Sequence, residues 1–218
     1  MKKYSVVLFD LDGTLLDTLE DLADAVNVAL GMHGLPCRTR EEVRAFIGNG
    51  IVKLMERAVG AEQARLVDMA QVVDDFREYY FAHCEDKTAP YEGVIDVLTD
   101  LRAQGVRVGV VSNKADFAVQ KLCRAYFGDL VEVAIGENEA EGRRKKPAPD
   151  TLIDAMRSFG AAAEDVVYVG DSEVDILTAK NANVACVSVT WGMKDKAFLL
   201  ENGATILVGK VTDLLSVL

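Results

Sequence analysis

Two aspartates separated by a single residue are the feature of this sequence best suited to chemistry. Asp10 and Asp12 follow the apolar run at residues 6–9. They precede Gly13, which permits a sharp turn, and Thr14, which adds a hydroxyl. Side chains two residues apart on a strand point the same way, and two like charges there are costly without a cation between them. Mg²⁺ with oxygen ligands is the expected cation, although a plain strand-ending turn rich in Asp and Gly stays open at this point.

A serine and an asparagine follow a second predicted strand. Ser112 and Asn113 come directly after the apolar run at residues 106–111, and we expect them to open the next helix. A hydroxyl and backbone N–H groups at a helix start can bind a phosphate group. Because Ser and Asn are also common helix caps, a purely structural role stays open here.

The densest basic run of the chain ends in a lysine that precedes a proline. Residues 143–146 are all basic, and Pro147 and Pro149 follow them. Such a run is usually a solvated loop. Proline stiffens the loop and restricts the preceding residue, so it would fix where the Lys146 side chain points. We therefore expect Lys146 to serve a site and the other three basic residues to lie mainly on the surface.

A fourth polar segment follows another apolar run, at residues 166–169. It reads Gly170-Asp171-Ser172-Glu173-Val174-Asp175. Asp171 and Asp175 are four residues apart, so both carboxylates would face one side if a helix began here.

Alternating strands and helices are expected to position these residues. Apart from the strand at 6–9, the strand patterns lie after residue 89, at 106–111, 131–135, 166–169, 184–189 and 205–208, with helices between them. This order predicts an α/β, Rossmann-like parallel sheet covered by helices on both faces. Ligands bind such sheets at the carboxyl ends of the strands, which is where the polar segments lie.

The stretch between the first two strands predicts helices alone. Thr18 with Asp21, and Thr39 with Glu42, have the spacing of capping boxes at two helix starts. A third helix is expected near 51–59 and a fourth from about 62 to 83. The expected organisation is a core domain of residues 1–16 and 89–218 with an inserted all-helical domain of residues 17–88.

The four polar segments, in this order, resemble the four motifs of the haloacid dehalogenase superfamily, and the helical insert resembles its C1 cap. The resemblance implies that Asp10 is a nucleophile forming an aspartyl phosphate, and that Asp12 is a general acid and base. It also implies that Mg²⁺ is bound by Asp10, the Asp12 carbonyl and Asp171, with Asp175 in a supporting position. The implied phosphate-binding groups are Gly13, Thr14, Ser112, Asn113 and Lys146.

Several shorter phrases resemble the phosphoglycolate phosphatase branch of that superfamily. They are Phe46-Ile47-Gly48-Asn49-Gly50, Tyr91-Glu92-Gly93-Val94, Ser112-Asn113-Lys114 and Thr190-Trp191-Gly192. The implied substrate is a small phosphorylated metabolite, with 2-phosphoglycolate first. A pyrophosphatase, a sugar-phosphate phosphatase and a phosphomutase resembling β-phosphoglucomutase stay open. A non-catalytic relative that binds a phosphorylated ligand is less favoured because every site group is present.

Composition limits the remaining classes. The 218 residues carry a formal net charge of −11, which argues against general binding to nucleic acid or anionic membranes. The four cysteines lie far apart, which favours reduced thiols over a disulfide framework or structural zinc. Two lysines precede the first apolar run, but Asp10 and Asp12 interrupt it too early for a secretory signal. We expect a cytoplasmic protein, as a monomer or a homodimer.

Overall fold

The computed structural model describes residues 3–138 and 142–218 of the chain. These residues divide into two compact units. We call residues 1–17 and 90–218 the core unit, and residues 18–89 the helical unit. The chain passes between the units at two places, where the short strands β2 (Leu16–Asp17) and β3 (Ala89–Pro90) pair with each other.

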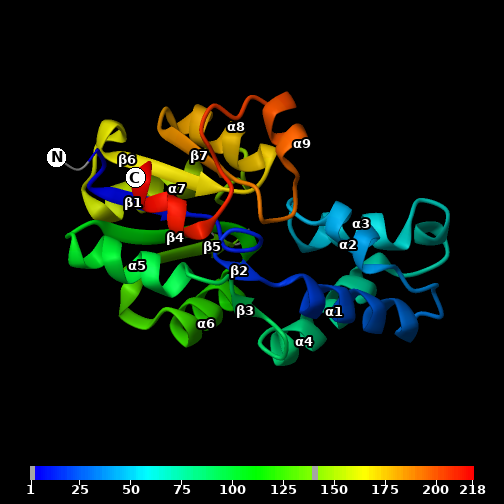
Figure 1. The fold of residues 1–218 in the computed structure, drawn as a ribbon. Coiled ribbons are helices and arrows are strands. Elements are labelled where there is room, and N and C mark those ends of the chain that lie inside the picture. The colour runs from blue at the N-terminus through cyan, green and yellow to red at the C-terminus, as the bar shows by residue number, and fades with distance from the viewer. Residues whose placement is uncertain (1–2, 139–141) are drawn as a thin grey trace. The chain divides into compact units, whose positions relative to one another are not determined.

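The core unit contains the predicted parallel sheet, in the strand order β5-β4-β1-β6-β7-β8 (Figure 1). All five neighbouring pairs are parallel, and β1 lies between β4 and β6. Continuous apolar runs suit strands that are buried on both faces, and every residue of β1 is buried. The strands are β1 (Val6–Phe9), β4 (Arg107–Ala115), β5 (Val133–Glu137), β6 (Val166–Gly170), β7 (Ala185–Val189) and β8 (Leu207–Val208).

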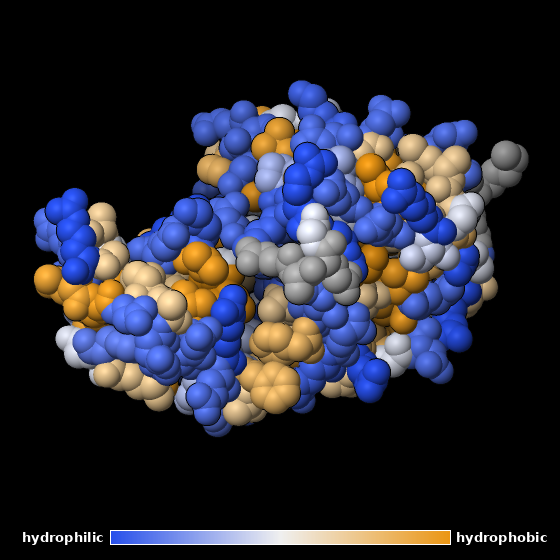
Figure 2. Space-filling model, turned by 180° about the vertical axis from the view of Figure 1, so that it is seen from behind, coloured by the Kyte–Doolittle hydropathy of each residue, from blue (hydrophilic) through white to orange (hydrophobic). Residues whose placement is uncertain are grey.

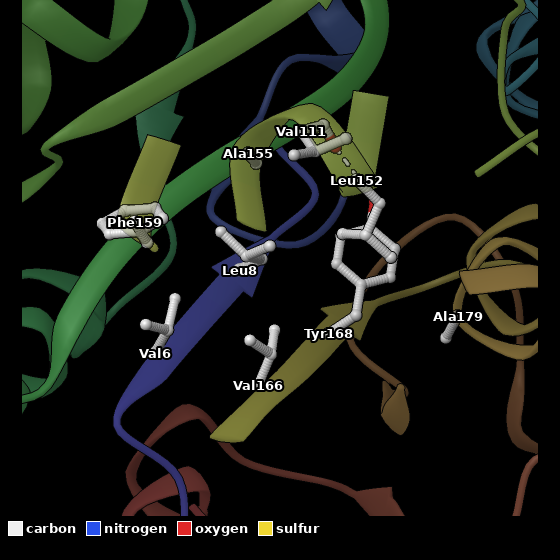
Figure 3. Close-up of a cluster of buried hydrophobic side chains, with 9 residues drawn as sticks. All are labelled: Val6, Leu8, Val111, Leu152, Ala155, Phe159, Val166, Tyr168 and Ala179. Carbon is white, nitrogen blue, oxygen red and sulfur yellow. Dashed lines mark hydrogen bonds between the residues drawn. The ribbon is translucent and has the colours of Figure 1, made fainter. Parts of the chain in front are cut away.

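Helices connect these strands, as the alternating pattern predicts. One face of the sheet packs against the buried sides of α7 and α8 (Figure 3). That apolar cluster contains Val6, Leu8, Val166 and Tyr168 from the strands, with Leu152, Ala155, Phe159 and Ala179 from the helices. The helices of the core unit are α5 (Val94–Ala103), α6 (Asp116–Tyr126), α7 (Asp150–Phe159), α8 (Glu173–Ala182) and α9 (Lys196–Glu201).

The helical unit is built around the first of its helices, α1, which packs against both α2 and α4. Its helices are α1 (Leu19–Met32), α2 (Arg40–Phe46), α3 (Ile51–Val59) and α4 (Met69–His83). The expected helix from residue 62 is wrong at its start. Asp68 caps α4 by accepting from the N–H groups of Ala70 and Gln71. Leu66, which lies inside the expected helix, is outside α4 and 83% exposed.

Only one of the two predicted capping boxes in this unit forms. In α2 the Thr39 hydroxyl accepts from Glu42 N at 3.2 Å, and the Glu42 carboxylate accepts from Thr39 N at 2.7 Å. The box predicted for Thr18 and Asp21 is wrong, because the Thr18 side chain caps nothing. Asp21 instead accepts from the backbone N–H groups of Lys87 and Thr88, 66 and 67 residues away. A partner so distant in sequence is invisible to a local pattern.

On the face drawn in Figure 2, most residues are hydrophilic and the hydrophobic residues lie in several separate groups. Among the described residues, no helix has the length and apolar character needed to cross a membrane.

Candidate active site

Three of the four polar segments meet at the carboxyl ends of adjacent strands. Asp10 follows β1, Ser112 lies near the end of β4, and Asp171 follows β6. The Asp10 N–H donates to the carbonyl of Val169 at 2.8 Å, which holds the end of β1 beside β6. The parallel sheet thus brings together Asp10 and Asp171, which lie 161 positions apart.

The carboxylate of Asp171 is enclosed by close backbone approaches. Gly13 has a φ of +81°, and a Cβ atom there would collide with the Asp171 carboxylate. A Cβ atom at Gly192 would collide with both the Asp171 carboxylate and the Gly13 carbonyl. The backbone N–H of Met193 donates to Asp171 Oδ2 at 2.5 Å. Glycine at both positions is therefore required by this packing.

Lys146 is a buried cation at the centre of a cluster of carboxylates. It is 4% exposed, and its Nζ lies 3.0 Å from Asp10 Oδ1 and 2.7 Å from Asp175 Oδ1. The contact with Asp10 has ion-pair distance without the directional geometry of a hydrogen bond, so Asp10 Oδ1 stays buried without a hydrogen-bond donor. The ammonium also donates to the hydroxyl of Tyr168 at 2.8 Å.

The backbone of Lys146 is held by Asn113. The Asn113 amide group donates to the Lys146 carbonyl at 3.0 Å, and its oxygen accepts from Lys146 N at 2.8 Å. The second and third polar segments are therefore joined by a two-point clamp. This contact, like the one to Tyr168, has no counterpart in the sequence pattern.

Three carboxylates converge beside Lys146. One oxygen each of Asp10, Asp171 and Asp175 lies within 4.8 Å of the others, a grouping that could hold a metal ion. Asp175, however, spends both oxygens on protein donors, with Lys146 on Oδ1 and the N–H and hydroxyl of Ser172 on Oδ2. Asp10 and Asp171 are thus the better candidates for ligands, and hard carboxylate oxygens suit Mg²⁺. Helix α8 begins at Glu173, so Asp171 lies before the helix and the condition set on a shared helix face is not met, although the two carboxylates do lie close together.

Burial and mutual repulsion shift the pKa values of these carboxyl groups upward. Burial raises the pKa of Asp10 to about 6; the Lys146 charge opposes this rise, and the Asp175 and Asp12 charges add to it. Burial, followed by the charges of Asp175 and Asp10, raises the pKa of Asp171 well above its ordinary value. Burial alone would lower the pKa of Lys146, but the Asp10 and Asp175 carboxylates outweigh it and raise that pKa. A bound cation would lower the free-energy cost of ionising both Asp10 and Asp171.

Asp12 has a charged partner, Lys114, whose role was not predicted from the sequence. Lys114 Nζ donates to both carboxylate oxygens of Asp12, at 2.9 and 3.1 Å. The Lys114 side chain is 4% exposed, and the two residues are 102 positions apart. The only sequence indication was the place of Lys114 directly after Ser112 and Asn113.

The surroundings of Ser112 differ from the expectation. Ser112 and Asn113 lie inside β4, which runs on to Ala115, so the predicted position at a helix start is wrong. The Ser112 hydroxyl accepts from Lys114 N at 3.3 Å and is buried. The hydroxyl of Thr14 is buried without a hydrogen-bond partner, which suits a group that waits for a ligand.

The three basic neighbours of Lys146 have acidic partners away from the site. Arg144 pairs with Asp150, Lys145 Nζ lies 2.6 Å from Glu137, and Arg143 lies 3.8 Å from Asp154. None of these three residues is buried, whereas Lys146 is. The expected division of the run between one inward lysine and outward neighbours agrees with these positions.

Known proteins with similar sequences are hydrolases. The family model described as haloacid dehalogenase-like hydrolase matches residues 7–189. Phosphoglycolate phosphatase 1 of Pseudomonas aeruginosa is 34% identical over 220 residues, which cover 96% of this chain and 78% of that protein. Phosphoglycolate phosphatase of Caulobacter vibrioides is 34% identical over 196 residues, which cover 88% of this chain and 81% of that protein.

Solved structures agree with this grouping. A predicted phosphoglycolate phosphatase from Haemophilus somnus is 30% identical, with a TM-score of 0.91 over 100% of this chain and 99% of that chain. CbbY from Rhodobacter sphaeroides, solved in complex with phosphate, is 25% identical, with a TM-score of 0.79 over 97% of this chain and 96% of that chain. The chain therefore belongs to the haloacid dehalogenase-like hydrolase family, among relatives that are phosphatases.

Proposed function

We propose that this phosphatase is a Mg²⁺-dependent phosphomonoesterase that hydrolyses a small phosphorylated metabolite through a phosphorylated Asp10. The supporting observation is the buried cluster in which Lys146 Nζ lies 3.0 Å from a carboxylate oxygen of Asp10 that has no hydrogen-bond donor. Ligands bind parallel sheets at the carboxyl ends of the strands, where this cluster lies. A buried carboxylate there, next to a fixed ammonium, is suited to attack an anionic centre.

Two aspartates divide the covalent and the proton-transfer work. An Asp10 oxygen attacks phosphorus, the bond from phosphorus to the leaving oxygen breaks, and Asp12 donates a proton to that oxygen. Asp12 then accepts a proton from the water that cleaves the acyl phosphate, which regenerates both aspartates. Asp12 must leave the contact with Lys114 or share it to reach the leaving group.

Charge stabilisation comes from groups around the phosphoryl oxygens. Lys146, the hydroxyls of Ser112 and Thr14 and the backbone N–H groups near Gly13 are the donors in this proposal. The side chain of Asn113, also expected to bind phosphate, is instead bonded to the backbone of Lys146 and is not a donor here. Asp10, Asp171 and the Asp12 carbonyl would hold one Mg²⁺, which when bound offsets the repulsion between the nucleophile and the substrate. Asp175 positions Lys146 and Ser172 and is not a ligand in this scheme.

The substrate assignment rests on relatives. Those at 34% identity are named phosphoglycolate phosphatases, so we propose 2-phosphoglycolate as the first candidate. We also propose that the helical unit is a cap that reads the part of the substrate other than phosphate. Its Gly48–Gly50 loop is the candidate element, whereas Lys53 pairs with Glu56 at 2.6 Å on its own helix and Asn49 accepts from Arg57 at 2.6 Å. The cytoplasmic location and the oligomeric state stay predictions.

The test is phosphate release from a panel containing 2-phosphoglycolate, pyrophosphate and sugar monophosphates. We expect turnover with Mg²⁺, loss of turnover after chelation, and inhibition by Ca²⁺, whose larger and looser shell fits an in-line attack poorly. The expected covalent species is a phosphoryl adduct on Asp10, detected by mass spectrometry after rapid quenching. Full activity after exhaustive chelation would contradict the metal-assisted scheme, and isomerisation of a sugar phosphate without phosphate release would favour a mutase.

A further inference from the structure

Tyr168 is a buried tyrosine whose polar end lies at the site, although its ring belongs to the apolar core. It stands on β6 with 0% exposure, and its ring packs in the cluster formed with α7 and α8 (Figure 3). A phenylalanine would supply the same apolar ring. A tyrosine hydroxyl in such surroundings needs hydrogen-bond partners, because an unpaired buried hydroxyl costs stability.

The Tyr168 hydroxyl joins three parts of the site. It accepts a hydrogen bond from Lys146 Nζ at 2.8 Å. It lies 2.9 Å from the carbonyl of Val111, the residue before Ser112, and 3.0 Å from Asp175 Oδ1. With one proton, the hydroxyl can donate to either of these two acceptors while it accepts from the lysine.

The Lys146 ammonium has two hydrogen-bond acceptors and a further ion-pair partner, Asp10. An ammonium group has three donors and no acceptor. Lys146 Nζ donates one proton to the Tyr168 oxygen and one to Asp175 Oδ1 at 2.7 Å. The third proton remains for the direction of Asp10, whose Oδ1 lies 3.0 Å from Nζ. Removal of the Tyr168 oxygen would leave one proton of a buried cation without an acceptor and free the ammonium to turn.

We propose that Tyr168 is a positioning residue, whose hydroxyl orients the Lys146 ammonium toward Asp10 and the phosphoryl group. The inference rests on the proposed function and deepens it. The alternative is that the hydroxyl serves only to bond the Val111 carbonyl, as a structural link between β6 and β4. The two differ in whether the effect of the hydroxyl passes through Lys146.

The kinetic test compares Tyr168→Phe with Tyr80→Phe, which removes the hydroxyl of another tyrosine that is 1% exposed but lies in the helical unit. We expect Tyr168→Phe to lower kcat roughly tenfold to hundredfold with little change in KM, the scale of one hydrogen bond to a buried charge. Tyr80→Phe should stay within about threefold of wild type. In a Lys146→Met background, Tyr168→Phe should lower the residual rate by less than twofold, because coupled residues are not additive. A loss of equal size in both backgrounds, or no loss in either, would overturn the proposal.

A second measurement needs no activity. The Lys146 ammonium should give a slowly exchanging ¹⁵Nζ signal in metal-free protein, assigned by its absence in Lys146→Arg. Tyr168→Phe should shift that signal or broaden it by faster exchange, whereas Tyr80→Phe should leave it unchanged. An unchanged signal in Tyr168→Phe would overturn the positioning role. A wild-type chain without phosphatase activity would overturn the proposed function, and the signal would still decide whether Tyr168 holds the lysine.

Discussion

Both units of the chain bury carboxylates, and the kinds of partner differ. In the helical unit Asp21 is 3% exposed and accepts three hydrogen bonds from the N–H groups of Lys87 and Thr88. In the core unit Asp10 and Asp171 face further carboxylates, and their pKa values are raised. Backbone donors satisfy a carboxylate and fix a loop. Clustered charges that oppose one another are retained at a cost in stability, which is the pattern expected of a functional site.

Among the carboxylates compared, replacement of the proposed nucleophile, Asp10, should have the largest effect on kcat. Asp10→Asn removes the attacking anion while it preserves shape, so we expect kcat to fall by at least about a thousandfold. Phosphate release from the best panel substrate measures this, with circular dichroism to verify folding. Turnover within about tenfold of wild type would show that Asp10 is not the nucleophile.

Lys146 and Lys145 offer a matched pair within one loop. Lys146→Ala should cost about 3 kcal/mol of transition-state stabilisation, because it removes a preorganised charge from a buried site. Lys145→Ala should stay within about tenfold of wild type, since its partner Glu137 is not among the site residues. Values of kcat/KM at fixed Mg²⁺ decide the matter. Similar losses in both variants would mean that the third segment has been misassigned.

The raised pKa of Asp10 predicts a pH-dependent cost in the metal-free protein. Because that pKa rises from 3.8 to about 6 on folding, the folded state binds more protons between these values, and its stability falls as the pH rises through them. Asp10→Asn should therefore stabilise the metal-free chain at pH 7.5, by at most about 3 kcal/mol, and the gain should shrink toward pH 4. Calorimetry with a chelator present at several pH values measures it. A gain that is equal at all pH values would contradict the assigned cause.

Replacement of Asp21 should lower stability and leave kcat nearly unchanged, and its effect should be smaller than those above. Asp21→Ala leaves the N–H groups of Lys87 and Thr88 without their acceptor and should lower the free energy of unfolding by about 2 kcal/mol. The kcat of the folded fraction should stay within about threefold of wild type. Chemical denaturation and phosphate release measure the two quantities. A large loss of kcat at unchanged stability would show that Asp21 is a functional carboxylate and not a structural one.

The sequence was sufficient for what depends on local order. Apolar runs followed by polar residues located β1, β4 and β6 and the chemistry at their ends. It was not sufficient for contacts that the fold creates between distant segments. The partnership of Lys114 with Asp12 spans 102 residues and that of Met193 with Asp171 spans 22, and neither follows from periodicity. Where a local pattern did fail, at Asp21, a distant backbone segment had taken the carboxylate that a capping box would have used.

The clamp between Asn113 and the backbone of Lys146 has a consequence for engineering. Loop grafting between relatives assumes that a loop carries its own conformation. Here the backbone N–H and carbonyl of the loop residue Lys146 are both bonded by one side chain on strand β4, 33 residues earlier. A transplanted lysine loop would keep its residues but lose its alignment unless the asparagine moved with it, so the two segments form one exchangeable module.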